Sequence, residues 1–129
     1  MAVSPAGRCV EGMARNQVHD SEFPAKGAEM RNEARKFVTA MNENFPHIYV
    51  NDRLQPTVCL VEEAGEFAGA MRRYMNLARR PGTIEEAEEE LADVVISAYI
   101  AAEVYNLDLK KAIGRKWEKI FSRGYRDLR

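Results

Sequence analysis

The sequence predicts an all-α fold, with four helices in a single domain. Apolar residues recur at steps of three and four in several successive segments, which is the period of an amphipathic helix. Proline, glycine and capping residues mark where these segments begin and end. No segment shows the alternation of apolar and polar residues that is typical of a β-strand. A chain of 129 residues also has the usual size of one domain.

Turn-forming and capping residues separate the four predicted helices. The first helix should end at Pro46, and the third should break at Asn106. Thr83 and Glu86 have the spacing of a capping box, which predicts the start of the third helix, and Asp108 can cap the fourth. The helices are expected over residues 28–45, 57–78, 83–106 and 109–122, with a loop over residues 46–56.

The second and third predicted helices carry surfaces that need a partner. The second half of the third helix is apolar on nearly all sides, which indicates burial at the centre of a bundle or at a subunit interface. Because one short chain cannot readily cover this surface, we expect a bundle completed by dimerisation, in a homodimer or homotetramer. Gly65 and Gly69 cost the second helix roughly 1 kcal/mol each relative to alanine, so a backbone or ligand should approach closely there.

The N-terminal residues and the charge balance limit the location and partners of the protein. Residues 1–26 mix Gly, Pro and Ser with scattered charges and should form a flexible or irregular arm before a domain over residues 27–129. The arm shows no secretory pattern, and the longest apolar stretch, residues 94–102, is too short to span a bilayer. We therefore expect a cytoplasmic protein. A formal net charge of −1 predicts no general attraction to nucleic acid or to a membrane.

Four acidic residues form two matching pairs on successive predicted helices. Glu63 and Glu66 are one turn apart on the second helix, and Glu90 and Asp93 are one turn apart on the third. If these faces meet, four carboxylates converge, and a divalent cation relieves their mutual repulsion. Oxygen ligands suit Mg²⁺, with Mn²⁺ as a substitute, and Mg²⁺ leaves positions open for phosphate oxygens and water. The pattern therefore predicts a metal site that acts on a phosphoanhydride.

Other interpretations of the acidic residues stay open. The glutamates between residues 85 and 90 can form a solvated face near a helix N-terminus, where the macrodipole favours carboxylates. A non-enzymatic helical adaptor or regulatory bundle can carry such a surface. A carboxylate-bridged di-iron site needs two Glu-x-x-His motifs, and neither His19 nor His47 completes one. Stabilisation by millimolar Mg²⁺ would separate the enzyme from the adaptor.

The acidic motifs also point to a known family. Glu62, Glu63 and Glu66 form an EExxE motif, and Glu90 and Asp93 form ExxD on the next helix. This pair of motifs resembles the hallmark of the MazG-like all-α nucleoside triphosphate pyrophosphohydrolases. The resemblance implies a four-helix MazG-like bundle that dimerises, with the metal between the second and third helices. The implied reaction is hydrolysis of an NTP or dNTP between the α and β phosphates, giving the monophosphate and pyrophosphate.

Further substrate and catalytic candidates lie around these motifs. The family's fourth helix carries K-x₃-N-x₂-R for phosphate contact, which Lys116 and Arg123 match, whereas Ile120 stands in the place of the asparagine. Glu62 lies beside the ligands and is the candidate for the base that takes a proton from the attacking water. Arg73 is a candidate for a substrate phosphate. Both Glu62 and Arg73 can also be ordinary exposed charges.

Overall fold

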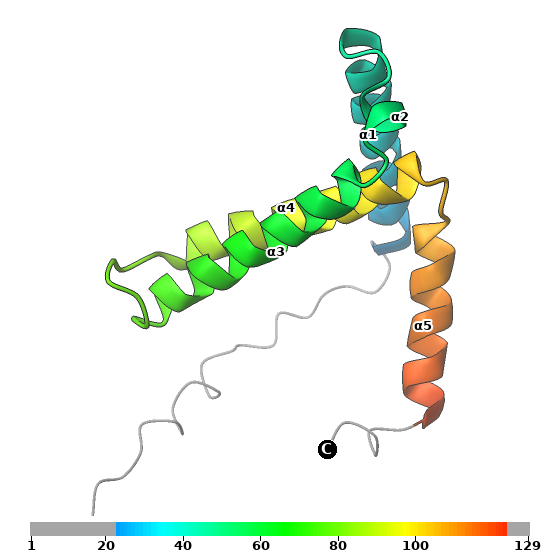
Figure 1. Cartoon of the computed structure of the whole chain (residues 1–129). Helices are drawn as coiled ribbons and strands as arrows, with labels where there is room; N and C mark the ends of the chain where they lie inside the picture. The colour runs from blue at the N-terminus through cyan, green and yellow to red at the C-terminus, as the bar shows by residue number, and fades with distance from the viewer. Residues whose placement is uncertain (1–22, 124–129) are drawn as a thin grey trace, which may run out of the picture.

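The computed structural model describes residues 23–123 and is all-α over that range, as predicted. Four long helices and one single-turn helix follow each other along the chain, and no strand occurs among the described residues (Figure 1). They are α1 (Phe23–Asn44), α2 (Ile48–Asn51), α3 (Gln55–Tyr74), α4 (Ile84–Val104) and α5 (Leu109–Arg123). None of these helices has the length and apolar composition needed to cross a membrane.

Helices α3 and α4 form an antiparallel hairpin (Figure 1), which is the most extensive contact among the five described helices. Ala70 on α3 and Ala87 on α4 are 0% and 2% exposed. Small buried side chains of this kind let two helix backbones approach closely, and larger side chains would hold them apart. The facing residues of the two helices are therefore placed within reach of each other.

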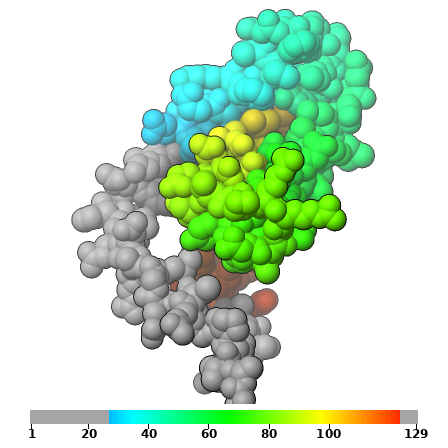
Figure 2. Space-filling view, turned by 90° about the vertical axis from the view of Figure 1, so that its left-hand side faces the viewer, coloured from blue at the N-terminus to red at the C-terminus, as the bar shows by residue number. Residues whose placement is uncertain are grey.

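Helix α1 crosses the C-terminal half of α4 and closes one end of the hairpin. Figure 2, which views the molecule from the loop end of the hairpin, shows α1 and α2 standing above it. Arg35 Nε donates to Glu103 Oε1 over 2.9 Å, which ties α1 to α4. The hydroxyl of Tyr105, just after α4, donates to the carbonyl oxygen of Arg53 over 2.6 Å and also lies 2.8 Å from Thr57 Oγ1. These bonds fix the start of α3 beside the end of α4.

The predicted capping signals are confirmed. Thr83 Oγ1 accepts from the backbone N–H of Glu86, and the Glu86 carboxylate accepts from the N–H of Thr83, which completes the capping box of α4. Asp108 Oδ1 accepts from the backbone N–H of Lys111 over 3.1 Å in the first turn of α5. Asn106 has a φ of 55°, a left-handed conformation that prevents the helix from continuing between α4 and α5, as expected.

Several predicted boundaries were wrong. Helix α1 begins at Phe23, five residues before the expected start, so the last residues of the expected arm are helical, and residues 1–22 of that arm lie outside the described part. The predicted loop over residues 46–56 contains the single-turn helix α2 and the start of α3. Helix α3 can include Pro56 because this proline occupies its first turn, where a backbone N–H would have no partner within the helix. Helix α3 ends at Tyr74 because Asn76 adopts a φ of 58°.

Helix α5 leaves the end of α4 and points away from the hairpin (Figure 1). It makes only marginal contact with the other described helices. Its aromatic side chains Trp117 and Phe121 stack on each other, with ring centroids 5.5 Å apart, yet they remain 52% and 62% exposed. The close approach expected at Gly65 is absent among the described residues, because a Cβ there would meet nothing within 4 Å. Completion of the bundle by a second copy stays a prediction.

Candidate metal centre

The hairpin brings three of the four predicted ligands together. Glu63 on α3 and Glu90 and Asp93 on α4 each offer a carboxylate oxygen, and these oxygens all lie within 4.8 Å of one another. Glu66, one turn after Glu63, lies close enough for its charge to raise the pKa of both Glu63 and Glu90, and so borders the same group. These four residues are called the acidic cluster below.

Electrostatics within the acidic cluster favours a bound cation. Partial burial between the helices, followed by the charges of Glu66, Asp93, Glu90 and Glu62, raises the pKa of Glu63. Partial burial also raises the pKa of Glu90, followed by the charges of Glu66 and Asp93. Ionising neighbouring carboxylates therefore costs free energy, and a positive ion between them would lower this cost.

The donor set fits a hard divalent cation. Two oxygens bound to one Mg²⁺ at about 2.1 Å can be at most about 4.2 Å apart. Oxygens that already lie within 4.8 Å reach this separation by small side-chain rotations. Among the described residues no histidine or cysteine belongs to the group, which leaves an all-oxygen set suited to Mg²⁺ or Mn²⁺.

The other predicted site residues lie at different places. Glu62 is exposed on α3 and acts on Glu63 only as the weakest of its charged neighbours. Arg73 lies near the loop end of α3, and its charge opposes the rise in the pKa of Glu90. Lys116 and Arg123 are on α5, which points away from the hairpin, so one chain does not bring them to the acidic cluster.

A cavity of about 280 Å³ opens beside the acidic cluster on the side of α1. Glu63 and Asp93 lie in its wall, so it is continuous with the cluster. Its other lining residues are mostly apolar or aromatic, with three polar groups, and are Phe37, Met41, Tyr49, Gln55, Pro56, Cys59, Ile96, Ser97 and Ile100. A concave, mainly apolar wall with a few polar groups is typical of a small-molecule site.

Sequence reasoning missed this cavity. The periodicity of α1 placed Phe37 and Met41 on an apolar face but could not show that this face borders the carboxylates. Cys59 on α3 is half-buried, and its Sγ accepts from Gln55 Nε2 over 3.1 Å. The available signal was the position of Cys59 one turn, and of Gln55 two turns, before Glu63 on the same helix.

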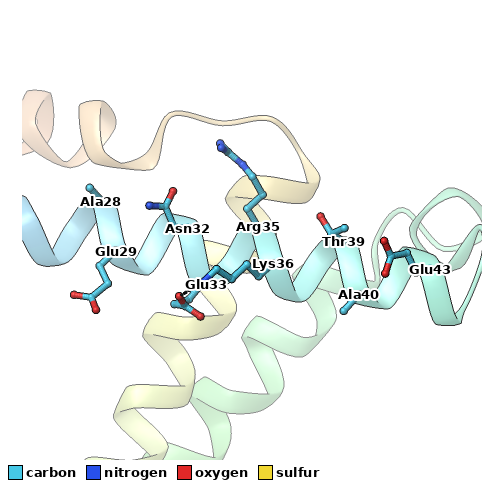
Figure 3. Close-up of a pocket in the computed structure, with 9 residues that line it drawn as sticks. All are labelled: Ala28, Glu29, Asn32, Glu33, Arg35, Lys36, Thr39, Ala40 and Glu43. Atoms are coloured by element: carbon cyan, nitrogen blue, oxygen red, sulfur yellow. Dashed lines mark hydrogen bonds and ion pairs between the residues drawn. The ribbon is translucent and has the colours of Figure 1, made fainter.

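Two other hollows differ in their relation to the acidic cluster. A cleft of about 560 Å³ at the loop end of the hairpin has Glu90 in its wall together with Arg73 and Arg80. Another hollow, of about 770 Å³, is an open groove along α1 and shares no lining residue with the acidic cluster. Figure 3 shows that its labelled side chains all come from this one helix. The groove along α1 therefore has no part in the candidate site.

Comparisons with known proteins bear on the same region. The family model of the MazG nucleotide pyrophosphohydrolase domain matches residues 53–125. This match includes α3, α4 and α5, and thus every predicted site residue. The comparisons with curated proteins and with solved structures gave no match. On the strength of the family match, the chain belongs to the MazG nucleotide pyrophosphohydrolase domain family.

Proposed function

We propose that this protein is a Mg²⁺-dependent nucleoside triphosphate pyrophosphohydrolase that cleaves an NTP or dNTP between the α and β phosphates. The products would be a nucleoside monophosphate and pyrophosphate, as suits removal of unwanted nucleotides from the cytoplasmic pool. The observation that carries the proposal is the convergence of Glu63, Glu90 and Asp93 from two helices within 4.8 Å. The family match supports the same reaction class.

The carboxylates of the acidic cluster have distinct tasks in this proposal. Glu63, Glu66, Glu90 and Asp93 would hold the Mg²⁺, for which Mn²⁺ can substitute. A bound Mg²⁺ supplies polarisation of phosphoryl oxygens and a lower pKa for a coordinated water. Glu62 remains outside the three closest ligands and exposed, so its carboxylate is free to accept the proton of the attacking water.

The cavity beside the acidic cluster suits the nucleoside. Phe37 and Tyr49 offer aromatic surface for a base, while the amide of Gln55 and the hydroxyl of Ser97 offer hydrogen bonds. Because Glu63 and Asp93 belong to the wall of this cavity, the phosphates of a nucleotide would reach the carboxylates if the 5′ side of its nucleoside faced them. This arrangement would place the α phosphate at the acidic cluster.

A second copy of the chain completes the proposed enzyme. Trp117 and Phe121 on α5 are exposed, and within residues 23–123 the other helices make only marginal contact with α5. Burial against another copy would cover these side chains in a homodimer or homotetramer. Lys116 and Arg123 lie on the same helix, so they would contact substrate phosphates where α5 of one copy reaches the acidic cluster of the next.

The decisive test is the product formed by the purified full chain. A panel of canonical and modified NTPs and dNTPs is incubated with Mg²⁺ or Mn²⁺, and pyrophosphate and orthophosphate are measured separately. We expect pyrophosphate from at least one substrate and none in the presence of EDTA. Orthophosphate as the first product would contradict the proposed bond cleavage. A non-enzymatic helical adaptor would give neither product, and Mg²⁺ would leave its stability unchanged.

A further inference from the structure

The loop end of the hairpin contains a second hollow directly beside the acidic cluster. It is the cleft of about 560 Å³ lined by Arg73, Arg80, Pro81, Glu86, Glu89 and Glu90, and it is called the loop-end cleft below. Glu90 belongs both to this cleft and to the acidic cluster. Whatever binds in the loop-end cleft can therefore also reach a cation held by the cluster.

Arg73 is held in the loop-end cleft by its neighbours. A Cβ on Gly82 would lie 2.7 Å from Cβ of Arg73, so only a glycine lets the loop pass this close to the arginine stem. Arg73 Nη1 lies 3.5 Å from the position of a Cβ on Gly69, one turn closer to Glu66. The guanidinium thus extends along α3 toward the acidic cluster, as helical side chains lean toward the N-terminus.

The three parts of the site follow one another along the hairpin. The cavity of Gln55 and Ser97 lies on the side of α1, the acidic cluster comes next, and the loop-end cleft lies beyond it. Glu66 and Arg73 are seven residues apart, which is about 10 Å along a helix. An extended ligand with an apolar end and an anionic end would match this order.

We propose that the loop-end cleft binds the β and γ phosphates of the nucleotide, with Arg73 and Arg80 as the residues of this cleft that contact them. The nucleoside then lies at the opposite end, and pyrophosphate leaves from the loop end of the hairpin. This inference rests on the proposed function, and it adds Arg80 and a direction of substrate binding that neither the sequence pattern nor the family match assigns.

The charges in the loop-end cleft are compatible with this role. Arg73 Nε stands 4.0 Å from Glu86 Oε2, and both side chains are well exposed. A loose, exposed ion pair contributes little to the free energy of folding, so Arg73 can exchange Glu86 for a phosphate at little cost in free energy. Phosphate offers arginine two parallel hydrogen bonds, which a distant carboxylate does not. Of the three carboxylates in the wall, Glu90 would be neutralised by the cation, leaving Glu86 and Glu89 against the two arginines.

Binding of inorganic pyrophosphate by the full chain tests the inference without relying on turnover. Titration calorimetry at fixed free Mg²⁺ would compare wild type with Arg80→Gln and with the matched control Arg79→Gln, a neighbour that does not line the cleft. We expect Arg80→Gln to weaken pyrophosphate binding about tenfold, the loss of one charge-assisted hydrogen bond. Arg79→Gln should match wild type. Binding of a nucleoside monophosphate should be the same in all three proteins.

The possible outcomes separate this inference from the proposed function. Equal pyrophosphate affinity in Arg80→Gln and Arg79→Gln would overturn the inference, even if wild type releases pyrophosphate from a nucleotide. Equal weakening of monophosphate and pyrophosphate binding by Arg80→Gln would also overturn it, because the cleft would then not select the terminal phosphates. A selective loss for pyrophosphate would support it, even if no tested nucleotide is hydrolysed. Arg73→Gln should show the same selective loss.

Discussion

Replacing Asp93 by asparagine is the sharpest test of the metal centre. Asp93 contributes one of the three carboxylate oxygens that lie within 4.8 Å of one another, and asparagine keeps its shape while removing its charge. In wild type, Mg²⁺ at one hundred times its Kd should stabilise the fold by about 2.7 kcal/mol. For a domain of this size, that free energy raises the melting temperature by about 10 °C. The variant should lose most of this rise.

Activity should fall together with the metal response. Weakening of a ligand carboxylate should lower kcat/KM by about a hundredfold or more, since even outer partners of metal ligands are worth about tenfold to a hundredfold. In EDTA the variant should be at least as stable as wild type, because one repelling charge has been removed. The double variant Glu66→Gln/Asp93→Asn should lose little more activity than the worse single variant.

The matched control is Glu88→Gln, an exposed glutamate of α4 outside the acidic cluster. Scanning calorimetry with Mg²⁺ and with EDTA, and pyrophosphate release, would be measured for all variants. A full Mg²⁺ response and near wild-type turnover in Asp93→Asn would refute the reasoning. The acidic cluster would then be a surface feature, and the enzymatic proposal would lose its main support.

Three further predictions concern the fold and its charges. Thr83→Ala should lower the free energy of unfolding in urea by about 1 kcal/mol through loss of the α4 cap, whereas Thr83→Ser should retain it. Ala70→Leu should cost about 1–3 kcal/mol by overpacking the hairpin, while Leu at the exposed Ala40 should be tolerated. The raised pKa values of Glu63 and Glu90 mean that the folded chain binds protons more tightly than the unfolded chain. In EDTA, thermal stability should therefore fall as the pH rises through these pKa values, and Mg²⁺ affinity should rise over the same interval.

The sequence was informative wherever local chemistry decides the structure. The capping box at Thr83 and the cap at Asp108 depend on residues within one turn, and both formed as predicted. The ExxD spacing places Glu90 and Asp93 on one face of any helix, so only the meeting of two helices remained to be shown. The all-α class followed from the same short-range periodicity.

Features that depend on distant segments were not predictable. The apolar period of α1 is the same whether Phe37 borders a core or a ligand cavity, because the crossing of α1 over α4 decides between them. Nothing in the local sequence connects Arg80 with Glu90, because only the course of the hairpin loop brings Arg80 into one cleft with Arg73 and Glu90. The outward course of α5 is set by the left-handed turn at Asn106, and its direction cannot be read from periodicity.

The position of α5 leads to a prediction about how two copies share a site. Within one chain, Lys116 and Arg123 are carried away from the acidic cluster, although they match the family's phosphate-binding pattern. Trp117 and Phe121 are exposed on α5, and in the proposed oligomer they pack against another copy. We therefore expect a dimer or tetramer by light scattering at micromolar concentration, with each acidic cluster completed by α5 of a neighbour.

Complementation between two inactive variants can test this sharing directly. Asp93→Asn removes a metal ligand, and Lys116→Gln/Arg123→Gln removes the α5 charges, so each homo-oligomer should be nearly inactive. If α5 acts on its neighbour, a mixed dimer has both defects in one site and leaves its other site intact. Random co-assembly of equal amounts makes about half of the dimers mixed, so about a quarter of wild-type activity should return. If α5 acts within its own chain, both sites of the mixed dimer are damaged and no activity returns. The shared site would be refuted if light scattering showed a monomer. It would also be refuted if the mixed dimer, purified through two different tags, had no activity.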